Sequence, residues 1–139
     1  MSVQQGPSEI KVSEIPVKVK YKLLHSTVHY NNQLILFGGE ELILFGRESN
    51  KVQIYDLSTR KYSEAVVSGT IPDPMCDHTA TFDEENQRML VFGGWPYHDG
   101  VAYSLDLTEM KWSIIDNVEY FRIYHSANLI ANSIYLFGG

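Results

Sequence analysis

The sequence predicts an all-β fold built from repeated four-stranded antiparallel sheets. Three observations support this prediction. The same group of motifs recurs about every 50 residues along the 139-residue chain, as expected of a repeat protein. The apolar runs are short, rich in β-branched or aromatic residues and followed by Gly-Gly. No segment shows a convincing helical periodicity.

The repeated unit begins at a histidine followed by a hydroxyl residue and extends through an apolar run to Gly-Gly. Its three copies occupy residues 25–39, 78–94 and 125–139. A second group of motifs, an Asp-Leu pair and a later aromatic residue, recurs in the same order: Asp56-Leu57 with Tyr62, then Asp106-Leu107 with Trp112. Several features in one order at one spacing are not expected by chance, so each unit is predicted to be one structural repeat.

Each unit is predicted to contain four strands joined by turns. The apolar runs before Gly-Gly, at residues 34–37, 89–92 and 134–137, have the composition of strands buried on both faces. The polar segments 31–32 and 84–87 precede the first two of these runs, so strands one and two should form a hairpin. The Asp-Leu pairs then begin a further turn, because an Asp side chain can accept hydrogen bonds from nearby backbone amides.

These units resemble the kelch repeat over roughly residues 25–139. The matching residues are the Phe-Gly-Gly triplets, the Tyr55-Asp56 and Leu105-Asp106 pairs and the later aromatic residues Tyr62 and Trp112. The resemblance implies that each repeat is one blade of a β-propeller, that the later aromatic packs against the double glycine, and that the blades surround a central channel. The residues directly before the histidines, Leu24, Asp77 and Tyr124, depart from the family pattern.

The repeats are expected over residues 22–139, after an N-terminal segment, 1–21, in which residues 9–20 could supply an outer strand. The predicted blades occupy residues 22–67 (blade 1), 75–116 (blade 2) and 122–139 (a partial blade 3). Because a propeller needs about 4–8 blades to close, the sequence predicts an incomplete ring. Three explanations stay open at this point: a piece of a longer protein, self-association into a ring, or an open arc.

An eight-residue segment of the first unit is nearly duplicated. The first copy, residues 34–41, lies at the expected distance from His25 and is predicted to hold the second strand. The second copy, residues 42–49, would fall in the following loop. It could extend that hairpin or compete for the register of the strand, because a slip of eight residues preserves which side chains face the core.

Composition restricts the classes of partner. The net charge of −6 and the pI of about 5.3 oppose nucleic-acid binding, which depends on clustered Lys and Arg. No apolar run reaches the roughly 18–20 residues of a membrane span, and the N-terminal residues lack the apolar region of a secretory signal. We therefore expect a cytoplasmic or nuclear protein with no nucleic-acid or membrane partner.

No catalytic residue, cofactor or metal site is predicted. His25, His78 and His125 occupy equivalent repeat positions, so we interpret them as structural residues. Cys76 and His78 could share a strand face, but the repeat already explains His78. The sequence contains no CxxC pair, no phosphate-binding glycine loop and no GxSxG motif.

The predicted function is a protein–protein interaction module, a kelch-repeat scaffold or adaptor, whose partner the sequence does not identify. The longer loops, between strands two and three and between consecutive blades, should emerge at one end, where a rigid scaffold commonly binds partners. The resemblance to kelch propellers also implies that a partner binds at this end. The candidate residues are Arg47, Glu48, Asp73, Met75, Trp95, Tyr97, His98, Asp99, Tyr120 and Arg122. The alternatives are a propeller-class enzyme domain or a truncated fragment without an independent function.

Overall fold

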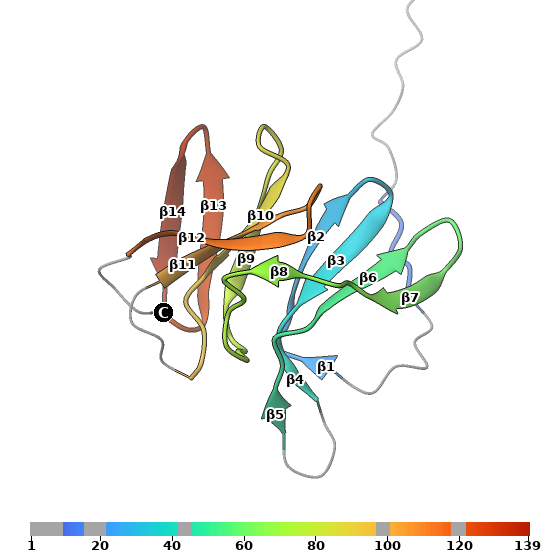
Figure 1. Cartoon of the computed structure of the whole chain (residues 1–139), viewed down its shortest axis with the longest axis horizontal. Helices are drawn as coiled ribbons and strands as arrows, with labels where there is room; N and C mark the ends of the chain where they lie inside the picture. The colour runs from blue at the N-terminus through green and yellow to red at the C-terminus, as the bar shows by residue number, and fades with distance from the viewer. Residues whose placement is uncertain (1–9, 16–21, 42–45, 97–100, 118–121) are drawn as a thin grey trace, which may run out of the picture.

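The computed structural model describes residues 10–15, 22–41, 46–96, 101–117 and 122–139. Every regular element in these ranges is a β-strand, which confirms the predicted all-β fold (Figure 1). Within the same ranges there is no helix long and apolar enough to cross a membrane.

The first unit is a four-stranded antiparallel sheet with the order β2-β3-β6-β7. Its strands are β2 (Ser26–Tyr30), β3 (Gln33–Phe37), β6 (Val52–Asp56) and β7 (Lys61–Glu64). Asn31 and Asn32 connect β2 to β3 with positive φ angles of 46° and 58°. Because Asn tolerates the left-handed conformation well, these two residues suit a tight hairpin turn.

The second unit repeats this arrangement and has one additional strand. Its strands are β9 (Thr79–Asp83), β10 (Arg88–Phe92), β11 (Val101–Asp106), β12 (Lys111–Asn117) and the short β8 (Ser68–Gly69). β8 pairs in parallel with the outer strand β12, a pairing that the sequence analysis did not predict. Gly69 makes it feasible, because a side chain there would collide with the carbonyl oxygen of Trp112.

The third unit contributes a hairpin of two strands, β13 (His125–Ile130) and β14 (Ser133–Gly138). Three short strands form a separate sheet below the first unit: β1 (Lys22–Leu23), β4 (Glu40–Glu41) and β5 (Arg47–Glu48). The first copy of the duplicated segment holds most of β3, and its last two residues form β4. β4 pairs with β5, which lies in the second copy, so the second copy extends a hairpin. Residues 42–45 lie outside the described ranges.

The N-terminal outer strand expected within residues 9–20 does not form in residues 10–15. These residues adopt no regular structure, and Ile10 and Val12 are almost fully exposed. The remaining residues of that segment lie outside the described ranges, so this part of the prediction stays open.

The two Asp-Leu turns form as predicted. Asp56 accepts hydrogen bonds from the amides of Ser58 (2.9 Å) and Thr59 (2.8 Å), and the bond from Thr59 is the main reason that the pKa of Asp56 is lowered. Asp106 accepts bonds from Thr108 and Glu109 in the same way, and the Thr108 hydroxyl contributes most to its lowered pKa. Both carboxylates therefore close the turn between the third and fourth strands.

Successive units stand side by side, with the first strand of each unit beside the first strand of the next, and they do not close into a ring (Figure 1). The main hydrophobic core lies between the first and second units. There Phe37, from the first Phe-Gly-Gly, packs against Trp112 with the ring centroids 4.7 Å apart. A smaller core of Leu90, Phe92 and Ala102 lies between the second and third units.

Histidines at the repeat position join each unit to the one before it. His78 Nε2 is hydrogen-bonded to Ser26 Oγ at 2.7 Å, and His125 Nε2 is hydrogen-bonded to Thr79 Oγ1 at 2.8 Å. The imidazole of His78 also lies so close to Gly38 that a Cβ built there would be 2.5 Å from His78 Cε1. The first glycine of the pair is therefore required for close packing between units.

Candidate functional site

The longer loops of all three units meet at one end of the sheets, which we call the loop end (residues 46–49, 73–77, 94–96 and 122–123). Backbone contacts tie these loops together: Ser49 pairs with Met75, and Cys76 pairs with Trp95. The Gly94 amide then donates to the Arg122 carbonyl at 3.1 Å. In Figure 1 this end lies toward the bottom, where β1, β4 and β5 are found.

Five predicted partner-binding residues lie at the loop end with at least part of the side chain accessible. Arg47 and Asp73 are exposed, and the Trp95 side chain is 40% exposed. Glu48 and Arg122 are half-buried. Arg122 Nη1 donates to the Gly138 carbonyl at 2.6 Å, which holds its guanidinium beside the third unit.

The structure corrects the prediction for Met75. Its side chain is only 1% exposed and belongs to the main core, with its sulfur close to Gly94. The backbone of Met75 runs along the loop end, but its thioether points into the protein and offers no surface to a partner. Four further candidates, Tyr97, His98, Asp99 and Tyr120, lie outside the described residues.

A buried thiol surrounded by carboxylates lies beneath the loop end. Cys76 Sγ lies 3.7 Å from Glu40 Oε1 and 3.6 Å from Asp77 Oδ2. Burial and then the charges of Asp77 and Glu40 raise the pKa of this thiol to about 12. It is therefore protonated at neutral pH and donates to its acidic neighbours. A cysteine nucleophile needs the opposite shift.

Cys76 and His78, which the sequence places two residues apart and which could share a strand face, make separate contacts. The imidazole of His78 is hydrogen-bonded to Ser26 in the preceding unit, and the thiol is directed toward carboxylates. Both groups therefore take part in contacts within the protein.

Glu40, Glu48 and Cys76 form a possible donor set that the sequence analysis missed. Their ligand atoms all lie within 4.8 Å of one another, a spacing that could admit a metal ion. The two glutamates meet only because β4 pairs with β5, which places Glu40 opposite Glu48. Cys76 joins them through the neighbouring pairing of Ser49 with Met75, so the group is visible only in the folded chain.

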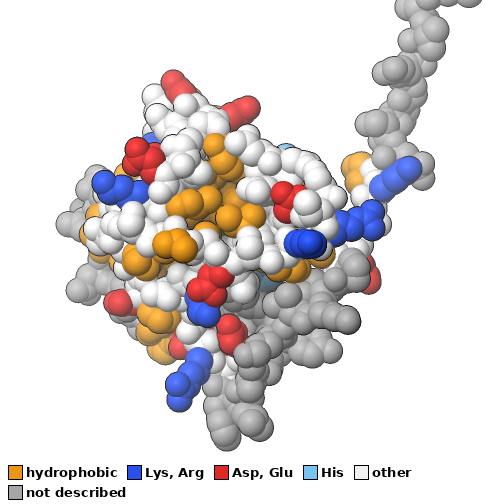
Figure 2. Space-filling view, turned by 45° about the vertical axis from the view of Figure 1, so that its right-hand side comes forward, with side chains coloured by type: hydrophobic (Ala, Val, Ile, Leu, Met, Phe, Trp, Pro, Cys, Tyr) orange, Lys and Arg blue, Asp and Glu red, His pale blue; other side chains and the backbone are white. Residues whose placement is uncertain are grey.

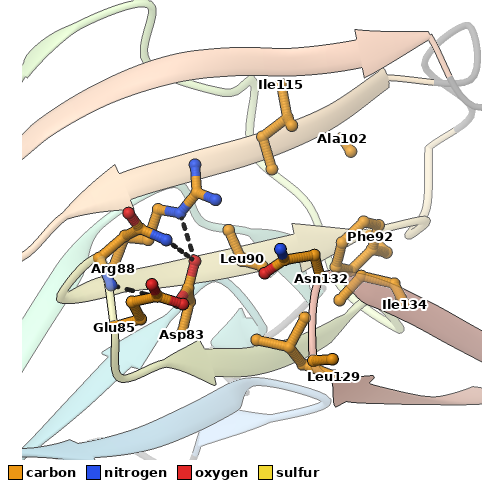
Figure 3. A pocket seen from close by; sticks show the side chains of 12 residues that line it. Asp83, Glu85, Arg88, Leu90, Phe92, Ala102, Ile115, Leu129, Asn132 and Ile134 are labelled. Atoms are coloured by element: carbon orange, nitrogen blue, oxygen red, sulfur yellow. Dashed lines mark hydrogen bonds and ion pairs between the residues drawn. The ribbon is translucent and has the colours of Figure 1, made fainter.

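A pocket of about 470 Å³ opens between the second unit and the third-unit hairpin (Figure 3). Leu90, Phe92, Ala102 and Ile115 line it from the second unit, and Leu129 and Ile134 line it from the third. The ion pair between Arg88 Nε and Asp83 Oδ2, 2.7 Å long, lies at its other end. The pocket is therefore apolar on one side and charged on the other.

Exposed apolar side chains also occur away from the loop end. Figure 2 shows hydrophobic side chains gathered near the middle of one face, with charged side chains around them. The exposed apolar residues of the chain include Val66, Ile71 and Ile114. Single exposed apolar residues are common on soluble proteins, so they do not by themselves define a site.

Comparison with known proteins agrees with the repeat architecture. The chain matches the family model described as the KLHDC2/KLHL20/DRC7 Kelch-repeats domain over residues 24–139. It is 29% identical over 133 residues to Kelch domain-containing protein 3 of Rattus norvegicus, a match that covers 91% of this chain and 34% of that protein. The chain thus spans about a third of the length of this relative.

Two other relatives carry different names. Host cell factor 2 of Homo sapiens is 32% identical over 138 residues, covering 85% of this chain and 17% of that protein. Dynein regulatory complex subunit 7 of Chlamydomonas reinhardtii is 30% identical over 121 residues, covering 83% of this chain and 10% of that protein. The resemblance seen in the repeated motifs is confirmed by these matches.

Proposed function

The chain belongs to the kelch-repeat family, and from that premise we propose that it is a protein-interaction module that binds a partner protein at the loop end. We describe this role as that of a scaffold or adaptor, and it involves no catalytic step. One of the relatives is named as a subunit of a regulatory complex, which is in keeping with a binding role. We expect the partner in the cytoplasm or nucleus, as the composition suggests.

The observation that supports this proposal best is the way in which loops from three units are fixed beside one another. The pairings of Ser49 with Met75 and of Cys76 with Trp95 leave these loops little independent freedom. A surface ordered in advance loses less conformational entropy when a partner binds. It also presents Arg and Trp side chains, the types that most often anchor protein interfaces.

The two ends of the sheets provide an internal control for this proposal. Arg47 and Asp73 are exposed at the loop end, and Arg60 and Glu109 are exposed in the short turns after β6 and β11. A photo-crosslinking amino acid placed at each position, in cells, should yield a discrete adduct from positions 47 and 73 only. Mass spectrometry would then identify the adduct.

The identified partner allows a quantitative test. Arg47→Glu and Asp73→Lys should each weaken its binding about tenfold or more, the effect expected of an interface anchor, whereas Arg60→Glu should change affinity less than about twofold. Equal crosslinking from both ends, or unchanged affinity of both loop-end variants, would remove the loop end as the binding surface.

A further inference from the structure

Three carboxylates lie around one buried sulfur beneath the loop end. One oxygen each of Glu40 and Glu48 and the Cys76 sulfur lie within 4.8 Å of one another. Asp77 Oδ2 lies 3.6 Å from the same sulfur. All three acidic side chains are half-buried. They come from β4, β5 and the loop that leads to β9, so the group lies where the first unit meets the second.

The negative charge of this group is not neutralised within the part of the chain that the structure describes. The ion pairs there, Lys51–Glu64 and Arg88–Asp83, include none of the three carboxylates. The neighbouring thiol is protonated at neutral pH and adds no positive charge. Carboxylates held a few ångströms apart and partly out of water repel one another, so a cation placed among them would be stabilised.

An exposed tryptophan lies beside these carboxylates. Trp95 pairs with Cys76 through two backbone hydrogen bonds of 2.7 and 2.9 Å, and side chains directly opposite each other in such a pairing project on the same face. The Trp95 side chain is 40% exposed. The face of an indole ring attracts cations, and a guanidinium stacks on it well. The tryptophan therefore indicates a cationic ligand independently of the carboxylates.

We propose that Trp95 and the three carboxylates bind an arginine side chain of the partner protein. The guanidinium donates to carboxylate oxygens of Glu48 and Asp77 and stacks on the indole ring. Arginine suits this site better than lysine, because a guanidinium offers five N–H donors in one plane and is more weakly hydrated than an ammonium. The inference rests on the loop-end function proposed above and names the chemistry that this end selects.

Capped arginine, N-acetyl-arginine amide, is the probe, and the uncharged N-acetyl-citrulline amide is its matched control. In an NMR titration of the whole chain, capped arginine should shift the indole signal of Trp95 saturably, with a Kd of about 1–10 mM. The signal of the buried Trp112 should not move. Capped citrulline should shift neither signal. Raising the salt from about 50 to 500 mM should weaken arginine binding severalfold, because ions screen the carboxylates.

Substitutions that keep the size of the side chain test the carboxylates. Glu48→Gln and Asp77→Asn should each weaken binding of capped arginine at least about fivefold, because each removes a charged acceptor. Trp95→Leu should weaken it to a similar degree, measured from backbone signals of residues 76 and 77. Glu109→Gln, which removes an exposed carboxylate in the short turn after β11, should leave the Kd unchanged.

Equal effects of Asp77→Asn and Glu109→Gln would overturn the inference, and so would the absence of any Trp95 shift in the folded chain. The crosslinking test of the loop end does not use these variants or this probe. A discrete adduct from positions 47 and 73 together with no arginine binding would therefore reject the arginine site and leave the loop-end proposal standing.

Zinc tests the other cation that these donors would suit. Cys76→Ser removes a zinc ligand but no ligand of arginine, because the thiol is protonated and uncharged. We expect this variant to bind capped arginine as the parent chain does. Zn²⁺ that binds the parent chain with a Kd below about 1 μM, displaces capped arginine and no longer binds Cys76→Ser would assign the group to a metal and overturn the inference.

Discussion

The first and third units carry the same motif in opposite surroundings. Phe37, before the first Gly-Gly, is 0% exposed, whereas Phe137, before the last, is 82% exposed. Ile35 and Tyr135, two residues earlier, differ in the same way, at 0% and 58%. The motif therefore determines the strand and the direction of its side chains, but burial depends on whether a following unit covers the face.

The largest expected difference between the two regions concerns the phenylalanines. Phe37→Ala should lower the free energy of unfolding by about 3–5 kcal/mol, because it leaves a cavity beside Trp112. Phe137→Ala should change it by less than about 0.5 kcal/mol, as for most exposed sites. Urea unfolding followed by circular dichroism measures both values. Similar losses would mean that the last face is covered in solution.

The next largest difference in stability is expected at Gly38 and Gly138, the glycines that follow these phenylalanines. Gly38 has φ +66°, and a Cβ there would lie 2.5 Å from His78 Cε1 and 2.7 Å from the Met75 oxygen. Gly138 has φ +82°, but the nearest atom to its Cβ would be 3.9 Å away. Gly38→Ala should therefore cost about 2–4 kcal/mol, combining backbone strain and overpacking.

Gly138→Ala should cost only the strain of the left-handed backbone, about 1–2 kcal/mol. Thermal denaturation of the two variants measures the difference. If Gly138→Ala were as costly as Gly38→Ala, a neighbour would have to lie against the third unit as closely as His78 lies against the first.

The hydroxyl residues should show a smaller contrast. Ser26 is hydrogen-bonded to His78 of the next unit, whereas Ser126, at the equivalent position, is exposed. Ser26→Ala should cost about 1–2 kcal/mol, because it removes the partner of a buried imidazole nitrogen. Ser126→Ala should lie within about 0.5 kcal/mol of the parent protein in the same unfolding assay.

The smallest expected effect is a dependence of the free energy of unfolding on pH. Burial, and secondarily the charge of Arg122, lowers the pKa of His125 below its ordinary value of 6.5. The unfolded chain then binds this proton more readily than the folded chain, so stability present above pH 6.5 is lost as the pH falls below it.

Acidification from about pH 7.5 to 5.5 should therefore lower the free energy of unfolding through this residue. His125→Gln should reduce the pH dependence over this interval, although it also removes the bond to Thr79. An unchanged slope of stability against pH in this variant would show that the histidine does not contribute.

Local patterns predicted the strands and turns of this protein well. The apolar runs before Gly-Gly form β3, β10 and β14, and Asp56 and Asp106 close the predicted turns. These features depend on residues close together in the sequence. β8 was missed because two residues are too few to show a periodicity, and its partner β12 lies some 40 residues away.

The candidate site was harder to predict because it depends on side-chain direction and on pairing between loops. Met75 follows a loop-like sequence, yet its side chain turns into the core. Glu40, Glu48 and Cys76 come together only through the pairings of β4 with β5 and of Ser49 with Met75. The spacing of these residues in the sequence therefore could not predict that they meet.

Hydrogen exchange of the backbone amides tests most directly whether the third unit differs from the first two in being covered on fewer sides. In the part of the chain that the structure describes, β3 and β10 have a strand on both sides, and β14 has a strand on one side. We expect strongly protected amides throughout β3 and β10, and rapid exchange at alternate amides of β14 that face away from β13. Uniform protection of β14 equal to that of β3 would contradict the account.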